Sequence, residues 1–265
     1  MSVVLAVLGC APPGAKVPDS ATDALRQQIN VGEPVNGPVS YLRAGNPAGP
    51  RVILVHGTPG SATAWTDYLL DVPSGWEVFA IDRPGFGRSG PEGAMPSLAA
   101  QAAAVAALLP QDGRPTVLLG HSLGGPVVAQ VAIDHPQKVS GLVLLAASLD
   151  PALEEIHPMQ YVGDWVLVRK LLPRVLRNSN AELLALKDEL DALAPQLSRI
   201  SAKVVIVHGT LDDLVPVANV PFMQARLSGS RCIKTVLLEG RNHFLPWNSQ
   251  AVVREAIQAA LEAAC

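Results

Sequence analysis

Cysteine is scarce in this chain of 265 residues, which contains only Cys10, Cys232 and Cys265. Three widely separated cysteines are too few for a disulfide framework, and the sequence has no Cys-x-x-Cys pair or Cys/His cluster. We therefore expect neither a disulfide-rich scaffold nor a structural zinc site, and we predict no bound metal.

Charged and aromatic residues are also few, at 16% and 4% of the chain. An average soluble domain is roughly 25% charged. Because 49% of this chain is apolar, extended disorder is excluded and a large packed core is expected. The 20 basic and 23 acidic residues give a net charge of −3 and form no long basic block. Binding to a run of phosphates needs clustered cations, so nucleic acid is not an expected partner.

Long uninterrupted apolar runs are missing as well. The longest uncharged segments, 93–111 and 115–133, are broken by Pro, Gly or Gln, which is typical of a soluble core rather than a membrane span. The start of the chain leaves two interpretations open. The apolar run 2–10 ends in Gly-Cys before a Pro-rich tract, as in a bacterial lipoprotein signal, but no Lys or Arg precedes it.

In the first interpretation, residues 1–24 are a lipoprotein signal and linker, and Cys10 tethers a periplasmic or membrane-anchored protein. In the second, the N-terminus is frayed and the protein is cytoplasmic. The other two cysteines bear on this choice. Cys232 opens the last predicted strand and Cys265 closes the helix after it, and a strand-loop-helix unit brings these two ends together. A disulfide between them can form in an oxidising compartment, and its presence would support export.

Apolar, β-branched runs alternate with segments of helical periodicity along most of the chain. Buried strands are predicted at 51–57, 76–82, 115–121, 141–148, 202–209 and 233–240, with short edge strands near 27–31 and 39–43. Helices are predicted near 62–70, 96–109, 123–134, 217–227 and 249–264. Strands that are apolar throughout and separated by helices form a mostly parallel sheet covered on both faces, so the predicted fold class is α/β.

The interval 150–198 breaks this alternation, because it has several helical stretches and no strand pattern. We interpret it as a short helical lid over the carboxyl ends of the strands, where open sheets bind ligands. It divides the core into a first part, 25–149, and a second part, 199–265. We expect an apolar pocket under the lid, although aromatic and Met side chains at this spacing are also typical of a core; the candidate lining residues are Trp65, His157, Met159, Tyr161 and Trp165.

A cationic stretch within this interval, 167–177, also has two interpretations. It could contact an anionic membrane, or it could be a solvated face of the lid. The sequence favours the second.

The strongest local motif is GHSLGG at 120–125, a G-x-S-x-G between a predicted strand and a predicted helix. A serine hydroxyl becomes a useful nucleophile when a tight turn exposes it beside a base. Small residues on either side of Ser122 allow that turn. The motif therefore predicts that Ser122 is a catalytic nucleophile.

A general base and an orienting carboxylate are available in two later loops, HGTLDDLVP at 208–216 and EGRNHFLPW at 239–247. Loops after parallel strands emerge at one edge of a sheet, so Asp212 and His243 can meet Ser122 there. The order Ser, Asp, His is that of a known hydrolase arrangement. Asp213 and Asp150 remain alternatives to Asp212.

Together these motifs resemble the α/β-hydrolase superfamily, from about Val39 to the C-terminus. The likeness includes HGTPG at 56–60 and IDRPGFGRS at 81–89. The resemblance implies that Ser122 is the nucleophile, that His243 is the general base and acid, and that Asp212 orients His243.

The same resemblance implies an oxyanion hole built from the backbone N–H groups of Leu123 and Thr58. It implies no cofactor. The remaining polar residues of these motifs are expected to brace loops or to pack, without a catalytic role: His56, His121, His135, His208 and Arg83.

Serine at the nucleophile position narrows the reaction. Relatives that open epoxides or displace halide attack with a carboxylate, so these activities are disfavoured. The expected reaction is acyl transfer to water, with a small-molecule carboxylic ester as the leading substrate. Alternatives are cleavage of an amide or N-terminal peptide bond, as in prolyl aminopeptidases, with Glu154 or Glu155 holding the amine; cleavage of a carbon–carbon bond; and a catalytically silent binding module.

Overall fold

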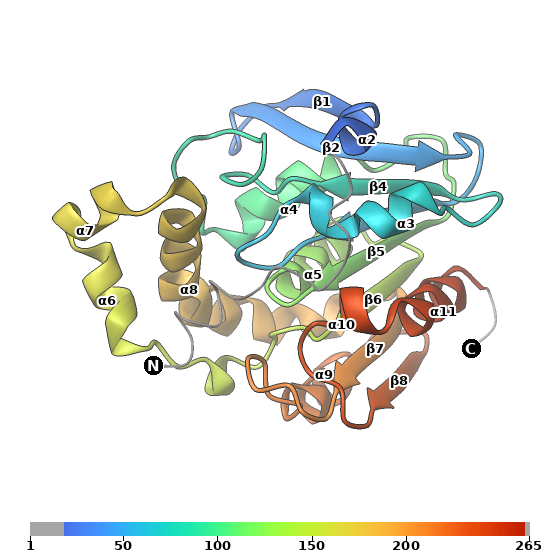
Figure 1. Cartoon of the computed structure of the whole chain (residues 1–265). Coiled ribbons are helices and arrows are strands. Elements are labelled where there is room, and N and C mark those ends of the chain that lie inside the picture. The colour runs from blue at the N-terminus through green and yellow to red at the C-terminus, as the bar shows by residue number, and fades with distance from the viewer. Residues whose placement is uncertain (1–18, 263–265) are drawn as a thin grey trace.

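The computed structural model describes residues 19–262 (Figure 1). The predicted signal with Cys10 lies outside the described residues, and so does Cys265. Cys232 is disulfide-bonded. In the described part of the chain, no helix has the length and apolar character needed to cross a bilayer.

One eight-stranded sheet organises the described residues, in the order β1-β2-β4-β3-β5-β6-β7-β8. β1 and β2 pair antiparallel, as do β2 and β4, and all other neighbours pair parallel. The strands are β1 (Arg26–Val31), β2 (Gly37–Gly45), β3 (Arg51–Val55), β4 (Glu77–Ile81), β5 (Thr116–His121), β6 (Gly141–Leu145), β7 (Lys203–Gly209) and β8 (Ile233–Leu238). The predicted α/β class and mostly parallel sheet are therefore confirmed.

Helices cover both faces of this sheet (Figure 1). Outside the segment between β6 and β7 they are α2 (Asp19–Asp23), η1 (Ala62–Trp65), α3 (Thr66–Leu70), α4 (Leu98–Ala106), α5 (Gly124–Asp134), α9 (Asn219–Arg226), α10 (Leu245–Asn248) and α11 (Gln250–Leu261). The helix predicted near 62–70 is two elements, a 3-10 turn followed by α3. The helix predicted near 96–109 is α4, which begins at Leu98 because Ser97 caps it by accepting from the Ala100 N–H.

The core divides into two clusters because side chains on a strand alternate between faces. Ile53 and Val55 of β3 pack with residues of α4, α5 and α8, whereas Val52 and Leu54 pack with residues of α3 and α11. All four side chains are fully buried. This double burial explains the continuous apolar run at 52–55 in β3.

The chain between β6 and β7 is helical, and it contains no strand between 151 and 199. Its elements are η2 (Pro151–Leu153), α6 (Pro158–Asp164), α7 (Val166–Leu171), α8 (Arg174–Leu193) and η3 (Ala194–Arg199). α8 contributes Leu186, Leu190 and Leu193 to the core. α6 and α7 lie at the far end of the molecule, with α8 between them and the sheet (Figure 1).

Candidate active site

Ser122 occupies the turn between β5 and α5, at the carboxyl edge of the sheet. Its backbone φ is +54°, in the left-handed region that non-glycine residues rarely adopt. The backbone at Ser122 is nevertheless hydrogen-bonded to β6 and α5. Its N–H donates to Leu145 O at 3.1 Å, and its carbonyl accepts from Gly125 N at 2.9 Å. Such a strained strand-to-helix turn holds a side chain out from the sheet edge.

Two glycines make this turn sterically feasible. A Cβ on Gly120 would collide with the carbonyl of Gly124, and a Cβ on Gly124 would lie 2.5 Å from the carbonyl oxygen of Val55. The G-x-S-x-G spacing therefore reflects close approach of three backbone segments.

His243 and Asp212 come from the loops that follow β8 and β7. The His243 Nδ1–H donates to Asp212 Oδ2 at 2.8 Å, and both side chains are buried. Asp212 is itself held, since its Oδ1 accepts from the backbone N–H groups of Leu214 at 3.1 Å and Val215 at 2.8 Å. The carboxylate is therefore fixed in the orientation that holds the imidazole.

The other two acid candidates are placed differently. Asp213 is exposed and lines the same pocket, but its side chain makes no hydrogen bond to His243 within the described chain. Asp150 caps η2 by accepting from the Ala152 N–H. Of the three carboxylates, Asp212 is the one that hydrogen-bonds to His243.

Two further imidazoles surround this pair. His121 Nε2–H donates to the carbonyl of His243 at 3.0 Å, and the two rings lie 4.7 Å apart between centroids. His208 Nε2–H donates to Val215 O at 2.9 Å and lies 3.5 Å from Asp212 Oδ2. Burial lowers the pKa of both His121 and His208, so both rings are neutral at neutral pH. His121 contacts the backbone of His243, and His208 contacts the loop that carries Asp212, which fits their predicted structural role.

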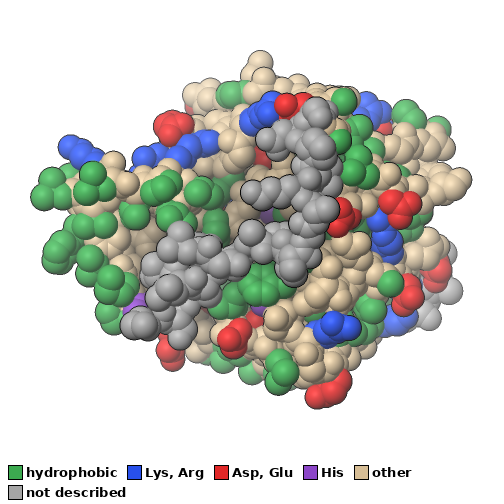
Figure 2. All heavy atoms as spheres, in the orientation of Figure 1, with side chains coloured by type: hydrophobic (Ala, Val, Ile, Leu, Met, Phe, Trp, Pro, Cys, Tyr) green, Lys and Arg blue, Asp and Glu red, His purple; other side chains and the backbone are tan. Residues whose placement is uncertain are grey.

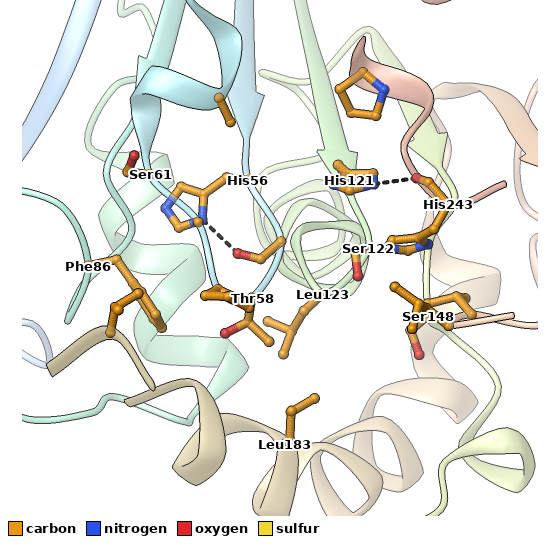
Figure 3. A pocket seen from close by; sticks show the side chains of 18 of the residues that line it. His56, Thr58, Ser61, Phe86, His121, Ser122, Leu123, Ser148, Leu183 and His243 are labelled. Atoms are coloured by element: carbon orange, nitrogen blue, oxygen red, sulfur yellow. Dashed lines mark hydrogen bonds between the residues drawn. The ribbon is translucent and has the colours of Figure 1, made fainter. Parts of the chain in front are cut away.

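The side chain of Ser122 and the ring of His243 line one pocket (Figure 3). Among residues 19–262 no hydrogen bond joins the Ser122 hydroxyl to that ring. Catalytic hydrogen bonds are often long before substrate binds and tighten in the complex.

Thr58 and Leu123, the two predicted oxyanion residues, also line this pocket. Leu123 directly precedes α5, where the first N–H groups of a helix have no intrahelical partner. Within the described part of the chain, no hydrogen bond uses the backbone N–H of either residue. Both donors are available to a ligand.

The side chains of His56 and Arg83 hold the loop that carries Thr58. The His56 Nδ1–H donates to Gly57 O at 2.7 Å, and its Nε2 accepts from the Arg83 N–H at 3.1 Å. Burial and the neighbouring Arg83 lower the pKa of His56, which keeps this ring neutral. Arg83 donates to the carbonyls of His56 and Gly57, each at 2.9 Å.

Arg83 is connected in turn to the helical segment. Its guanidinium makes two hydrogen bonds to the Glu182 carboxylate of α8, at 2.6 and 3.0 Å, and both side chains are buried. Gln101 of α4 donates to the same carboxylate at 3.0 Å. Glu182 was not singled out from the sequence, because nothing local marks a partner 99 residues away.

The pocket at this edge of the sheet has a volume of about 1120 Å³. Its far wall is formed by α8 and the residues just before it, including Pro173, Val175 and Leu183. Figure 3 shows Leu183 facing Leu123 across the cavity. The volume is sufficient for a small organic ligand.

The predicted pocket residues divide into two groups. Trp65 is fully buried and belongs to the lining. His157, Met159, Tyr161 and Trp165 do not: His157 caps α6, and the other three are exposed on α6 and at the start of α7. Helical spacing puts such side chains on one face, but it does not say whether that face turns toward the sheet.

Glu154, a candidate from the sequence for holding a substrate amine, lines the pocket, and so does Ser148, which no sequence motif marks. The Ser148 hydroxyl donates to the Glu154 carboxylate, and Ser148 N–H donates to Ser122 O at 3.4 Å. Burial raises the pKa of Glu154, while the hydrogen bond from Ser148 opposes that shift. In residues 19–262 no group of three or more His, Cys, Asp or Glu side chains is arranged to hold a metal ion.

The fold and this pocket define an α/β protein with its ligand site at the carboxyl edge of a parallel sheet. The family model for the alpha/beta hydrolase fold matches residues 50–169. A pimeloyl-[acyl-carrier protein] methyl ester esterase of Aeromonas hydrophila is 30% identical over 241 residues, covering 77% of this chain and 92% of that protein. The chain therefore belongs to the α/β-hydrolase family, and it has esterases among its relatives.

Solved structures agree on the fold. A membrane phospholipase A, described as a bacterial virulence factor, matches with a TM-score of 0.68 and 22% identity, covering 98% of this chain and 92% of that chain. The epoxide hydrolase CorEH matches with a TM-score of 0.71 and 19% identity, covering 89% and 99%. At these identities the likeness concerns the fold alone.

Proposed function

We propose that this protein is a serine hydrolase that cleaves a carboxylic ester through Ser122, His243 and Asp212. The observation that carries the proposal is the 2.8 Å hydrogen bond between His243 and Asp212, next to a serine held at a φ of +54° in the same pocket. Relatives that are esterases support the same reaction class.

In the first half of the proposed reaction, Ser122 Oγ attacks the ester carbonyl and His243 Nε2 takes its proton. Asp212 stabilises the imidazolium that forms, because its carboxylate already accepts from Nδ1. The oxyanion is stabilised by the backbone N–H groups of Thr58 and Leu123, whose dipoles are fixed before charge develops. His243 then returns the proton to the departing alcohol, leaving an acyl group on Ser122.

In the second half, His243 takes a proton from water, which attacks the acyl-enzyme. His243 then returns that proton to Ser122 Oγ as the bond to the acyl carbon breaks, and the acid is released. The proposed steps use side chains and backbone N–H groups of this chain, together with water, and proceed without a cofactor. Residues 150–198 serve as a lid in this proposal, since the pocket wall opposite Ser122 comes from α8 and the residues just before it.

The substrate proposed is a small-molecule ester. The Aeromonas relative is named for a methyl ester, which fits acyl transfer with a small alcohol as leaving group. The acyl side of the substrate would fill the apolar part of the pocket near Leu183 and Leu186.

Cleavage of an amide or of an N-terminal peptide bond is the second candidate, because Glu154 lines the pocket whereas Glu155 does not. A carboxylate holds an ammonium group well only when it is ionised. Burial raises the pKa of Glu154, which favours the neutral acid, and its Oε1 already accepts from Ser148. Esters therefore remain the preferred substrates.

A panel of p-nitrophenyl esters and aminoacyl p-nitroanilides separates these candidates. We expect turnover of the esters to exceed that of the anilides, and Ser122→Ala to lower kcat by about 10⁶-fold. Faster turnover of the anilides would transfer the proposal to the amidase class. Absence of turnover with every substrate would favour a binding module.

A further inference from the structure

α6 and α7 carry an unusual share of the exposed apolar side chains. Of the eleven large hydrophobic residues exposed in residues 19–262, seven lie between positions 159 and 175. We use the name α6–α7 surface for six of them: Met159, Tyr161, Trp165, Val166, Leu167 and Leu171. Figure 2 shows hydrophobic side chains gathered over these helices, at the left of the molecule. Exposed apolar clusters of this kind mark interaction sites.

The helices gain little stability from the rest of the fold. α7 buries none of its side chains, and α6 buries only Gln160. A six-residue helix is marginal in water unless an apolar face is covered. Leu167 and Leu171 are 77% and 85% exposed, so the side chains that packing would cover face solvent.

Positive charge accompanies this apolar surface. Residues 157–177 contain four Lys or Arg and one Asp, which gives +3, whereas the whole chain has −3, so the remainder carries −6. Lys170 makes no ion pair within the described residues, and Arg169 is paired with Asp164 at 3.5 Å. Glu92 pairs with both Arg174 and Arg177, so this end of the molecule carries +2 when that carboxylate is included, against −5 for the rest of the chain.

We propose that the α6–α7 surface docks on an anionic lipid bilayer. Short helices that combine Trp, Tyr and Leu with Lys and Arg are typical of segments lying in a membrane interface, where aromatic rings sit at headgroup level. A projecting tip inserts into a bilayer, whereas a stable protein partner needs a larger complementary face.

An acidic protein partner is less well matched. Arg174 and Arg177 pair with Glu92 and Arg169 pairs with Asp164, which leaves Lys170 unpaired among the described residues, so few cations are free to form specific ion pairs with a protein, and charge contributes only a general attraction to an anionic surface. Apolar area, rather than a set of free cations, dominates the surface. The proposal therefore favours the membrane interpretation of 167–177 over the solvated face.

The location of the surface relates docking to the pocket. α7 ends at Leu171, and Pro173, two residues later, is the first residue after α7 that lines the pocket. A bilayer that covers α6 and α7 would therefore lie close to the pocket wall formed by the start of α8. The inference concerns binding to lipid, so it does not depend on the proposed ester chemistry.

Co-sedimentation of the full chain with vesicles tests the proposal. We expect binding to vesicles of phosphatidylcholine mixed with phosphatidylglycerol and weaker binding to pure phosphatidylcholine. The double variant Leu167→Gln/Leu171→Gln should bind the mixed vesicles at least about tenfold more weakly, because two inserting side chains are lost. The matched control is Leu70→Gln/Leu237→Gln, which changes two leucines of about half exposure on α3 and β8; it should bind as the parent chain does.

Equal binding by the parent chain and the Leu167/Leu171 variant would overturn the proposal and point to another part of the chain. Equal binding to charged and uncharged vesicles would remove the role of anionic lipid. Sedimentation velocity without vesicles tests whether a second copy of this chain covers the surface instead. A dimer of the parent chain that the Leu167/Leu171 variant loses, together with no vesicle binding, would overturn the lipid proposal in favour of self-association.

Discussion

α7 and α8, two helices of the segment between β6 and β7, differ in how many side chains they bury. α8 buries Glu182, Leu186 and Leu190, contacts the core and forms a wall of the pocket. α7, a few residues earlier, buries none of its side chains. Both carry leucines at helical spacing, so composition alone does not separate them.

The difference lies in what each helix faces. α8 faces the sheet edge, and its Glu182 carboxylate reaches Arg83, which holds the carbonyls of His56 and Gly57. The loop that carries Thr58 is thus connected to α8 through one buried ion pair. Within residues 19–262, α6 and α7 have no buried ion pair of this kind; α6 is joined to α8 by a hydrogen bond from Asn180 to the carbonyl of Gln160 at 2.9 Å. Most of their apolar side chains stay exposed.

The loop after β7 shows a contrast between a buried and an exposed residue at two adjacent positions. Asp212 is buried and bound to His243, whereas Asp213 is exposed. We expect Asp212→Asn to lower kcat/KM by about 10⁴-fold, since the imidazole loses the partner that sets its tautomer. Asp213→Asn is the matched control, and ester kinetics measure both. The reverse ranking would transfer the acid role to Asp213.

The two ion pairs of the helical segment give the next largest difference. Glu182→Gln leaves the Arg83 charge buried and uncompensated, and should lower the free energy of unfolding by about 3–5 kcal/mol. Asp164→Asn breaks the exposed pair with Arg169 and should cost less than about 1 kcal/mol.

Urea denaturation measures these two costs. For Glu182→Gln we also expect a fall in kcat at nearly unchanged KM, because the loop that carries Thr58, the proposed oxyanion donor, loses its support. Unchanged stability and kcat in this variant would mean that α8 does not hold that loop.

Leucine truncation compares the packing of the two helices directly. Leu190→Ala removes a fully buried side chain of α8 and should lower the free energy of unfolding by about 3 kcal/mol. Leu167→Ala on α7 should change it by no more than about 0.5 kcal/mol. Similar costs at the two positions would mean that α7 packs against the protein in solution.

Acid sensitivity should come from the buried histidines near the pocket. Burial lowers the pKa of His56, His121 and His208 below 6.5, so as the pH falls below that value the unfolded chain takes up protons that the folded chain does not. Stability therefore falls with falling pH, by about 1.4 kcal/mol per pH unit for each histidine. Glu154 acts in the opposite direction, because its pKa is raised from 4.5, but it is one group against three.

His208→Gln isolates one of these contributions. Unfolding measured between neutral and mildly acidic pH should show a shallower slope in this variant, by about one proton. An unchanged slope would mean that His208 is not the buried neutral ring described above.

Much of the fold was predictable from the sequence, because strands buried on both faces contain continuous apolar runs, as at 117–119 in β5 and 204–207 in β7. The turn at Ser122 was also predictable, since only glycine fits at positions 120 and 124. His243 and Asp212 followed from their places after two strands of a parallel sheet, and whether they act as proposed awaits the kinetic tests.

Other features could not be found in this way. The Arg83–Glu182 pair joins residues 99 positions apart, and no local pattern marks it. Met159, Tyr161 and Trp165 were expected in the pocket and lie outside it, because helical periodicity identifies an apolar face without saying what the face contacts.

Covalent labelling with a fluorophosphonate tests the central claim most directly. Peptide mass mapping should find one modified residue, Ser122, and Ser122→Ala should abolish the label, while His243→Ala should slow labelling strongly. A label that persists in Ser122→Ala, or that maps to another residue, would contradict the account.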